Sequence, residues 1–194
     1  MAEVFLRRLT RWQADQQREA IADLYVAAYR GEPGHEYLDR RSFLERFSDD
    51  VQRPGFDMLV ASAGTAIAGC VYGYPPHREG HWWRGLNGGG AFGSFEELTA
   101  SGRVFALAEL MVLPSHRRSG VAGRLHRQLL MRVDASLLTT LLDPGNEAAT
   151  AAFTAWGWAR TGRLDAENGR GELDVWSRSG PFGVSLGEPS ARRA

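Results

Sequence analysis

The stretch VFALAELMVLPSHRRSGVAGRLHRQLLMRV, residues 104–133, decides the fold of this chain. It begins with an almost continuous apolar run in which Glu109 is the one charged residue. Such a run is typical of a strand that is buried on both faces. Pro114 removes a backbone donor and ends the strand. Apolar residues then return four positions apart, at Val121, Leu125, Leu129 and Val133. This spacing predicts a helix that lies on a sheet.

The corner between this strand and this helix has the character of an anion site. It comprises Arg117, Arg118, Ser119, Gly120, Val121, Ala122 and Gly123. The first turn of a helix has unpaired N–H groups and a partial positive charge, so it attracts anions. The two glycines have no Cβ, which lets a bulky group approach the backbone, and the arginines add charge-assisted contacts. The corner therefore predicts a cradle for a pyrophosphate, although neither GxxxxGK[ST] nor GxGxxG occurs in it.

The same corner resembles the acetyl-CoA-binding motif of the GCN5-related N-acetyltransferase (GNAT) family. That motif reads Arg/Gln-x-x-Gly-x-Gly/Ala, and Arg117, Gly120 and Ala122 fill it here, after the Val112-x-Pro114 that is usual in the family. The resemblance implies acetyl-CoA as co-substrate and direct transfer of its acetyl group to a primary amine. It also implies that the pantetheine arm pairs with the backbone of Leu110, Met111 and Val112, whose apolar side chains suit the core in either case.

Composition and charge indicate an ordinary globular chain. Hydrophobic residues make up 43% and charged residues 24% of the 194 positions, which fits one domain over residues 1–180 with a loose tail over 181–194. Basic and acidic residues number 23 each, so we expect neither a nucleic-acid partner nor a membrane surface. Cys70 is the only cysteine, and no signal peptide or spanning segment is evident, which suggests a buried thiol and a cytoplasmic location.

The remaining sequence alternates strands and helices. We expect strands over residues 4–9, 57–62, 66–74, 104–113, 137–142, 158–164 and 172–178. We expect helices over residues 14–29, 38–47, 121–133 and 147–156, with Arg46 on the outer side of the second. The interval 75–102 has little periodicity. The order predicts an α/β fold with a mixed, mostly antiparallel sheet flanked by helices, and it is similar to the acetyltransferase fold over roughly residues 4–178.

Glu109 is the candidate catalytic base. In the family reaction an amine attacks the thioester carbonyl after losing a proton, which suits a carboxylate acting directly or through water. An unpaired buried carboxylate is costly, so Glu109 either meets solvent in a cleft or has a polar partner. Both a catalytic and a structural role fit. Because side chains alternate along a strand, a bulge here decides which face Glu109 occupies.

A second segment, Asn146-x-x-Ala149-x-x-x-Phe153-x-x-x-Gly157-Trp158, resembles the family's Asn-x-x-Ala-x-x-x-Tyr-x-x-x-Gly-Phe. The resemblance implies that Asn146 contacts the cofactor, and capping of the following helix is the alternative role. Phe153 has no hydroxyl, so the family's usual general acid is missing there. Water can protonate a thiolate near neutral pH. Four side chains are further candidates for the general acid, and the spacing selects none of them: Tyr72, Tyr74, His81 and His116.

The acceptor site is expected beside the first two helices and the central strand. Tyr29, Tyr74 and Trp82 are its candidate residues, because aromatic rings hold an ammonium group well. Trp82 alternatively pins the long loop to the body. We expect a small-molecule or peptide amine, no metal, and, by analogy with the family alone, a homodimer. A catalytically silent acyl-CoA-binding domain is the alternative function, which Phe153 favours. A third possible function, less favoured by the flanking motifs, is the binding of another phosphate-bearing ligand at the same helix N-terminus.

Overall fold

The computed structural model describes residues 3–29, 36–77, 86–87, 99–165 and 172–181. It divides into two compact units, and each is described by itself. The first comprises Met1–Pro75 and Ala106–Val133, and the second comprises Pro76–Phe105 and Asp134–Ala194. The prediction of a single domain over residues 1–180 stays a prediction.

Four antiparallel strands form the sheet of the first unit. They lie in the order β1 (Val4–Leu9), β2 (Asp57–Ala63), β3 (Ala66–Tyr74) and β5 (Val104–Val112). Each agrees with its predicted range to within one residue. Gly64 closes the β2–β3 turn with φ of 62°, a conformation that glycine adopts at little cost.

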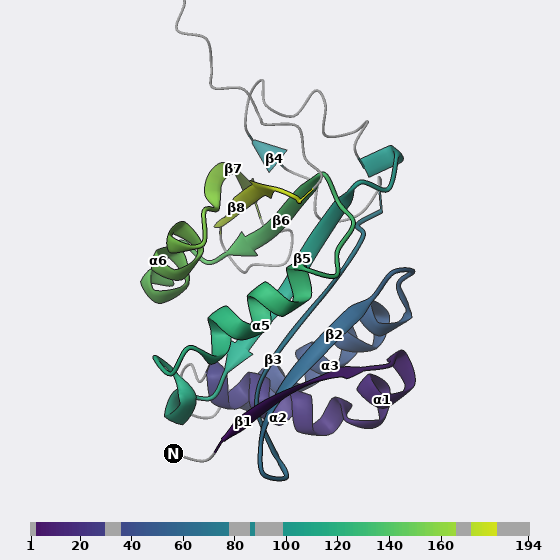
Figure 1. Cartoon of the computed structure of the whole chain (residues 1–194), viewed down its shortest axis with the longest axis vertical. Helices are drawn as coiled ribbons and strands as arrows, with labels where there is room; N and C mark the ends of the chain where they lie inside the picture. The colour runs from purple at the N-terminus through teal and green to yellow at the C-terminus, as the bar shows by residue number, and fades with distance from the viewer. Residues whose placement is uncertain (1–2, 30–35, 78–85, 88–98, 166–171, 182–194) are drawn as a thin grey trace, which may run out of the picture. The chain divides into compact units, whose positions relative to one another are not determined.

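Helices cover both faces of this sheet (Figure 1). One face carries α1 (Arg11–Gln16), α2 (Arg18–Ala28) and α3 (Glu36–Gln52), and α5 (Val121–Leu130) packs on β2 and β3 from the other. The prediction of one helix over 14–29 is wrong at its start, because α1 begins at Arg11 and is separate from α2. Thr10 and Gln13 form a capping box that starts α1 early, and Gln17 interrupts the helix.

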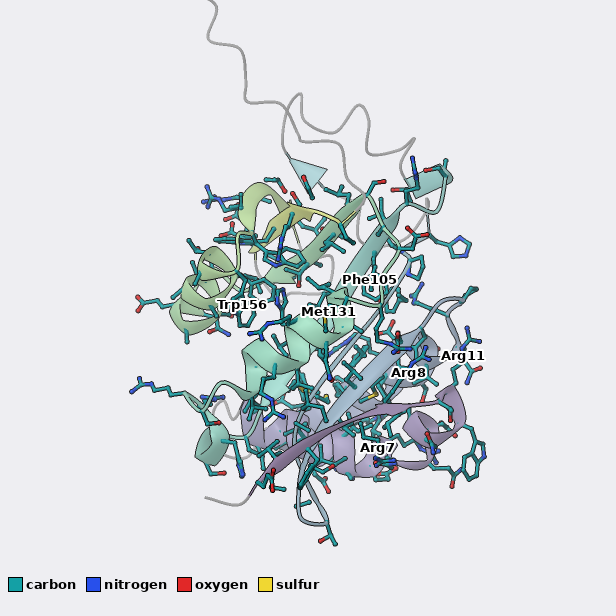
Figure 2. All side chains as sticks on the ribbon, viewed as in Figure 1. Arg7, Arg8, Arg11, Phe105, Met131 and Trp156 are labelled. Atoms are coloured by element: carbon teal, nitrogen blue, oxygen red, sulfur yellow. The ribbon has the colours of Figure 1, made fainter. Side chains whose placement is uncertain are left out.

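A close approach and a shared carboxylate fix α5 to the sheet. A Cβ on Gly69 would lie 2.8 Å from the carbonyl oxygen of Met111 and 3.4 Å from Cδ1 of Leu125, so glycine permits this packing. Arg8 of β1 donates to Asp57 at 2.6 Å, and Arg132, just after α5, donates to the same carboxylate at 3.4 Å. Figure 2 labels Arg8 on β1.

The second unit has its own antiparallel strands, in the order β6 (Leu137–Leu142), β8 (Glu172–Ser179), β7 (Ala159–Asp165) and β4 (Leu86–Asn87). Helix α6 (Glu147–Ala155) belongs to this unit, and its buried Phe153 packs against the rings of Trp156 and Trp158. The predictions match β6, β7, β8 and α6 to within one or two residues, but β4 was not predicted. The turn at 168–171 and most of the tail lie outside the described residues. Among the described helices, none has the length and apolar character that a membrane crossing requires.

Candidate active site

Glu109 owes its position to a bulge in β5. The register pairs Glu109 with Tyr72 but Leu107 with Gly73, so Ala108 is an extra residue. Side chains alternate between faces along a strand, and the extra residue reverses this alternation beyond it. Without the bulge, Glu109 would lie on the α5 face. With it, the side chain lies on the face that α2 and α3 cover, where it is 16% exposed.

Two side chains hold the carboxylate there. Arg46 of α3 donates from Nη2 to Oε1 at 3.1 Å, and the hydroxyl of Tyr29, the C-cap residue that follows α2, donates to Oε2 at 3.2 Å. The expectation that Arg46 faces outward is wrong, because its side chain is only 28% exposed. Its guanidinium also lies 5.6 Å from the ring centroid of Tyr25 and 5.7 Å from that of Phe43, within cation–π range.

Arg46 was not among the predicted site residues, although the sequence of α3 contained a signal. Phe43, Phe47 and Val51 form the buried stripe of this helix. Arg46 and Asp50 are four residues apart beside that stripe, and Asp50 is itself buried. Two opposite charges next to an apolar stripe indicate inward-facing charges that need partners.

Burial dominates the electrostatics of the carboxylate. Loss of hydration raises the pKa of Glu109 above that of an exposed carboxyl, while Arg46 and the Tyr29 hydroxyl act in the opposite direction. Desolvation of its hydroxyl and the charge of Glu109 raise the pKa of Tyr29, so it is a neutral donor at working pH. A carboxyl whose pKa is raised accepts a proton more readily near neutral pH, as a general base must.

Three residues that directly follow Glu109 in β5 are the candidates whose backbone would pair with the pantetheine arm. Leu110, Met111 and Val112 pair with Val71, Cys70 and Gly69 of β3. Met111 and Val112 are buried, and Leu110 is half-buried. Their side chains thus serve the core, as expected, and a role for their amides stays a prediction.

The start of α5 has the features of an anion cradle. Gly120 is its N-cap residue with φ of 80° and ψ of 0°, and no side chain caps the helix. A left-handed residue followed by helical residues turns successive N–H groups toward one concavity. Arg118 also has a positive φ, 59°. Residues 117–120 are exposed, and a Cβ on Gly120 would meet no atom within 4 Å.

Two residues of the cradle have other partners. The guanidinium of Arg117 donates to the carbonyls of Val112 and Ala28, which ties the end of α2 to this corner. Ser119 donates its hydroxyl to the carbonyl of His116 at 2.6 Å. Arg118 is therefore the better placed of the two arginines for an anion.

The other candidates have core or capping environments. The Asn146 side chain accepts the N–H of Ala149 at 3.0 Å and so caps α6. Tyr74 is buried, hydrogen-bonds Asp50 and lies beneath the guanidinium of Arg53. Trp82 lies outside the described residues. The roles of these three in binding stay predictions.

Within the described ranges, no group of three or more His, Cys, Asp or Glu side chains is arranged so that it could bind a metal ion. His77 and His81 are four residues apart in the sequence, but His81 lies outside those ranges.

Known proteins share this architecture. A model of the Acetyltransferase (GNAT) family matches residues 18–158. No curated protein matches the chain. Similar solved structures include aminoglycoside 6'-acetyltransferase type Ii, with 16% identity and a TM-score of 0.62 over 90% of this chain and 96% of that chain. PaiA N-acetyltransferase from Thermoplasma acidophilum, solved with coenzyme A, has 9% identity and a TM-score of 0.59 over 91% and 99%. The ribosomal-protein-S18-alanine N-acetyltransferase from Escherichia coli has 11% identity and a TM-score of 0.62 over 96% and 100%.

At such identities the likeness concerns the fold, and the predicted α/β class with a mixed, mostly antiparallel sheet flanked by helices is confirmed. The family model covers most of the chain, including the corner at residues 117–123. This chain belongs to the GNAT family of acetyltransferases.

Proposed function

We propose that this chain is an acetyl-CoA-dependent N-acetyltransferase that acts on a primary amine. The position of Glu109 carries the proposal. Its carboxylate is largely buried on the α2–α3 face and is held by Arg46 and Tyr29. The strand that bears it leads, through one short corner, to a helix start that no side chain caps.

The residues at the start of α5 suit the diphosphate of the co-substrate. We assign this group to the first-turn N–H groups of Val121, Ala122 and Gly123, with Arg118 contributing charge. The open space at Gly120 supports this assignment. Acetyl-CoA, when bound, supplies an acetyl group that is activated as a thioester.

Glu109 prepares the acceptor. An amine is largely protonated near neutral pH and has no free lone pair for attack until it loses a proton. Glu109 takes that proton: an N–H bond of the ammonium breaks, an O–H bond forms on the carboxyl, and the nitrogen keeps the electron pair. Burial favours this transfer because it raises the pKa of Glu109. The half-exposed ring of Tyr29 provides an aromatic surface for the ammonium group.

Thiol release from acetyl-CoA by the purified chain, with a panel of small and peptide amines, tests the function. We expect turnover with at least one amine. Glu109→Gln should lower kcat by about a hundredfold or more, a usual contribution of general-base catalysis. Coenzyme A affinity in calorimetry should stay within about twofold, because only the proton acceptor is lost. Glu45→Gln, on the exposed side of α3, is the control and should keep wild-type kinetics. Turnover that is unchanged in Glu109→Gln would remove this residue from the mechanism.

A catalytically silent acyl-CoA-binding domain is the second candidate, and Phe153 favours it. This residue stands where the family has its tyrosine, and its ring is buried against two tryptophans. Tight binding of coenzyme A without thiol release for any amine would support this candidate.

The proposal extends to the setting of the reaction. We infer a small-molecule or peptide amine as acceptor and a cytoplasmic location, for which the free, buried thiol of Cys70 is the supporting observation.

A further inference from the structure

Tyr72 has a hydroxyl that the fold leaves without a partner. The side chain is 0% exposed, and its ring packs against Phe47 at 5.2 Å and Phe56 at 5.6 Å between centroids. Among the residues that the structure describes, no protein atom hydrogen-bonds the hydroxyl. A buried polar group without a partner destabilises a protein and calls for an explanation. A phenylalanine would fill the same space without this cost.

The hydroxyl belongs to the surroundings of Glu109. Tyr72 is the cross-strand partner of Glu109, and the β5 bulge places both side chains on the face covered by α2 and α3. Directly opposed residues have Cβ atoms about 5 Å apart. Burial first, and then the charges of Glu109 and Asp50, raise the pKa of Tyr72. The hydroxyl therefore stays protonated and can always donate a hydrogen bond.

No direct hydrogen bond joins the Tyr72 hydroxyl to the Glu109 carboxylate, so a water molecule is the partner that could link them. Their polar atoms share a buried face but are not in direct hydrogen-bond contact. A water molecule in such a place needs two to four polar partners. The Tyr72 hydroxyl, the Glu109 carboxylate and the guanidinium of Arg46, which has five N–H donors, can supply them.

We propose that Tyr72 is a positioning residue for Glu109: its hydroxyl holds a water molecule against the carboxylate, and this water relays the proton of the acceptor amine. The inference rests on the proposed function. The ammonium gives one proton to the water as the water gives one of its own to Glu109. The nitrogen keeps its electron pair, and Tyr72 keeps its proton throughout.

Removal of the Tyr72 hydroxyl should change the pKa of Glu109 in a definite direction. Among the described residues, the titratable groups that interact with the site from the elements packed around it include Tyr25, Tyr29, Arg46, Asp50, Cys70 and Tyr72. Removal of the Tyr72 hydroxyl takes a donor away from the charged carboxylate and makes its surroundings more apolar. Both changes raise the pKa of Glu109. The acidic limb of the kcat/KM profile, where the base becomes protonated, should therefore move to higher pH.

Tyr72→Phe tests the proposal through three measurements. We expect kcat/KM to fall by about tenfold, which corresponds to about 1.4 kcal/mol of barrier. The acidic limb should rise by at least about half a pH unit, and the melting temperature should stay close to that of the wild type, because the ring packing is kept and only one hydrogen bond is lost. In a Glu109→Gln background, Tyr72→Phe should cause no further loss. Tyr74→Phe is the matched stability control: its hydroxyl has Asp50 as partner, so it should melt below the wild type.

A titration of the glutamate carboxyls by ¹³C NMR makes the test independent of turnover. The pKa of Glu109 should be higher in Tyr72→Phe than in the wild type. If Tyr72→Phe left the pKa of Glu109 unchanged, or left both kcat/KM and the acidic limb unchanged, Tyr72 would serve only the packing of the core. A wild type without turnover for any amine contradicts the proposed function instead, and the NMR titration then still decides the role of Tyr72.

Discussion

Replacement of Arg46 by methionine tests the central interaction of the candidate site. Methionine keeps an unbranched apolar stem but removes the positive charge. The Glu109 carboxylate would then lie largely buried, with only the Tyr29 hydroxyl still bound to it among its described partners. We expect a loss of stability that depends on pH.

The structure sets the size of this loss. Both side chains of the ion pair are less than one third exposed, at 28% and 16%. The pair therefore lies between a surface pair, worth about 0–1 kcal/mol, and a buried pair whose disruption costs about 3–5 kcal/mol. The cation–π contacts with Tyr25 and Phe43 add roughly 0.5–1 kcal/mol each. We expect a total of about 2–3 kcal/mol, which lowers the melting temperature of a chain of this size by about 5–10 °C.

Urea denaturation at pH 4 and pH 8 is the assay. Without Arg46 the pKa of Glu109 rises further, because the cation that opposes burial is gone. Arg46→Met should therefore lose more stability at pH 8, where Glu109 is ionised, than at pH 4. The double variant Arg46→Met/Glu109→Gln should recover about 1–2 kcal/mol at pH 8. Arg41→Met, in the exposed pair with Glu45 on the same helix, is the control and should cost about 0.5 kcal/mol or less.

Two results would refute this reasoning. Equal losses at both pH values would mean that Arg46 contributes packing and no charge. Additive losses in the double variant would mean that Arg46 and Glu109 do not interact energetically, and the site would then lack the electrostatic arrangement on which the proposed base depends.

Three further predictions concern single positions. Gly120→Asp should weaken coenzyme A binding at least about tenfold relative to Gly120→Asn in calorimetry. Aspartate and asparagine both tolerate the positive φ of this position and differ by one charge. Equal affinities of the two variants would show that the diphosphate does not bind at Gly120. Gly69→Ala should lower the free energy of unfolding by about 1–3 kcal/mol in urea, because its Cβ meets the Met111 carbonyl at 2.8 Å, and wild-type stability would contradict this packing. Burial raises the pKa of Glu109 on folding, so its contribution to stability is present below the unfolded pKa and is lost as pH rises through the folded pKa. Glu109→Gln should therefore gain relative to the wild type between pH 4 and pH 8, and a relative loss over this range would reverse the assigned shift.

Local signals in the sequence were sufficient for the elements that surround the site. The apolar run before Pro114 and the four-residue spacing after Gly120 predicted β5 and α5 to within a few residues. Asn146 predicted the start of α6 correctly, because a capping bond spans only three residues. The prediction for α1 failed because a competing local signal outweighed the apolar pattern: the capping box at Thr10 starts the helix before that pattern begins.

The site itself depends on contacts that periodicity does not encode. Arg46 is 63 positions from Glu109 in the sequence, and Tyr29 is 80 positions away. A charged residue beside an apolar stripe is usually solvated, so its inward orientation follows only from the presence of a buried carboxylate opposite it. Glu109 belongs to a strand far away in the sequence, and no spacing rule links it to Arg46.

The bulge at Ala108 connects these observations physically. On an unbroken strand, Glu109 would lie on the face where Gly69 brings β3 close to α5, among apolar groups such as Leu125. A carboxylate there would be unpaired and would destabilise the fold. One extra residue moves it to the opposite face, where Arg46 and Tyr29 stabilise its charge while burial raises its pKa. The bulge, Arg46 and Tyr29 therefore act together: each is needed for a buried base to be compatible with a stable sheet.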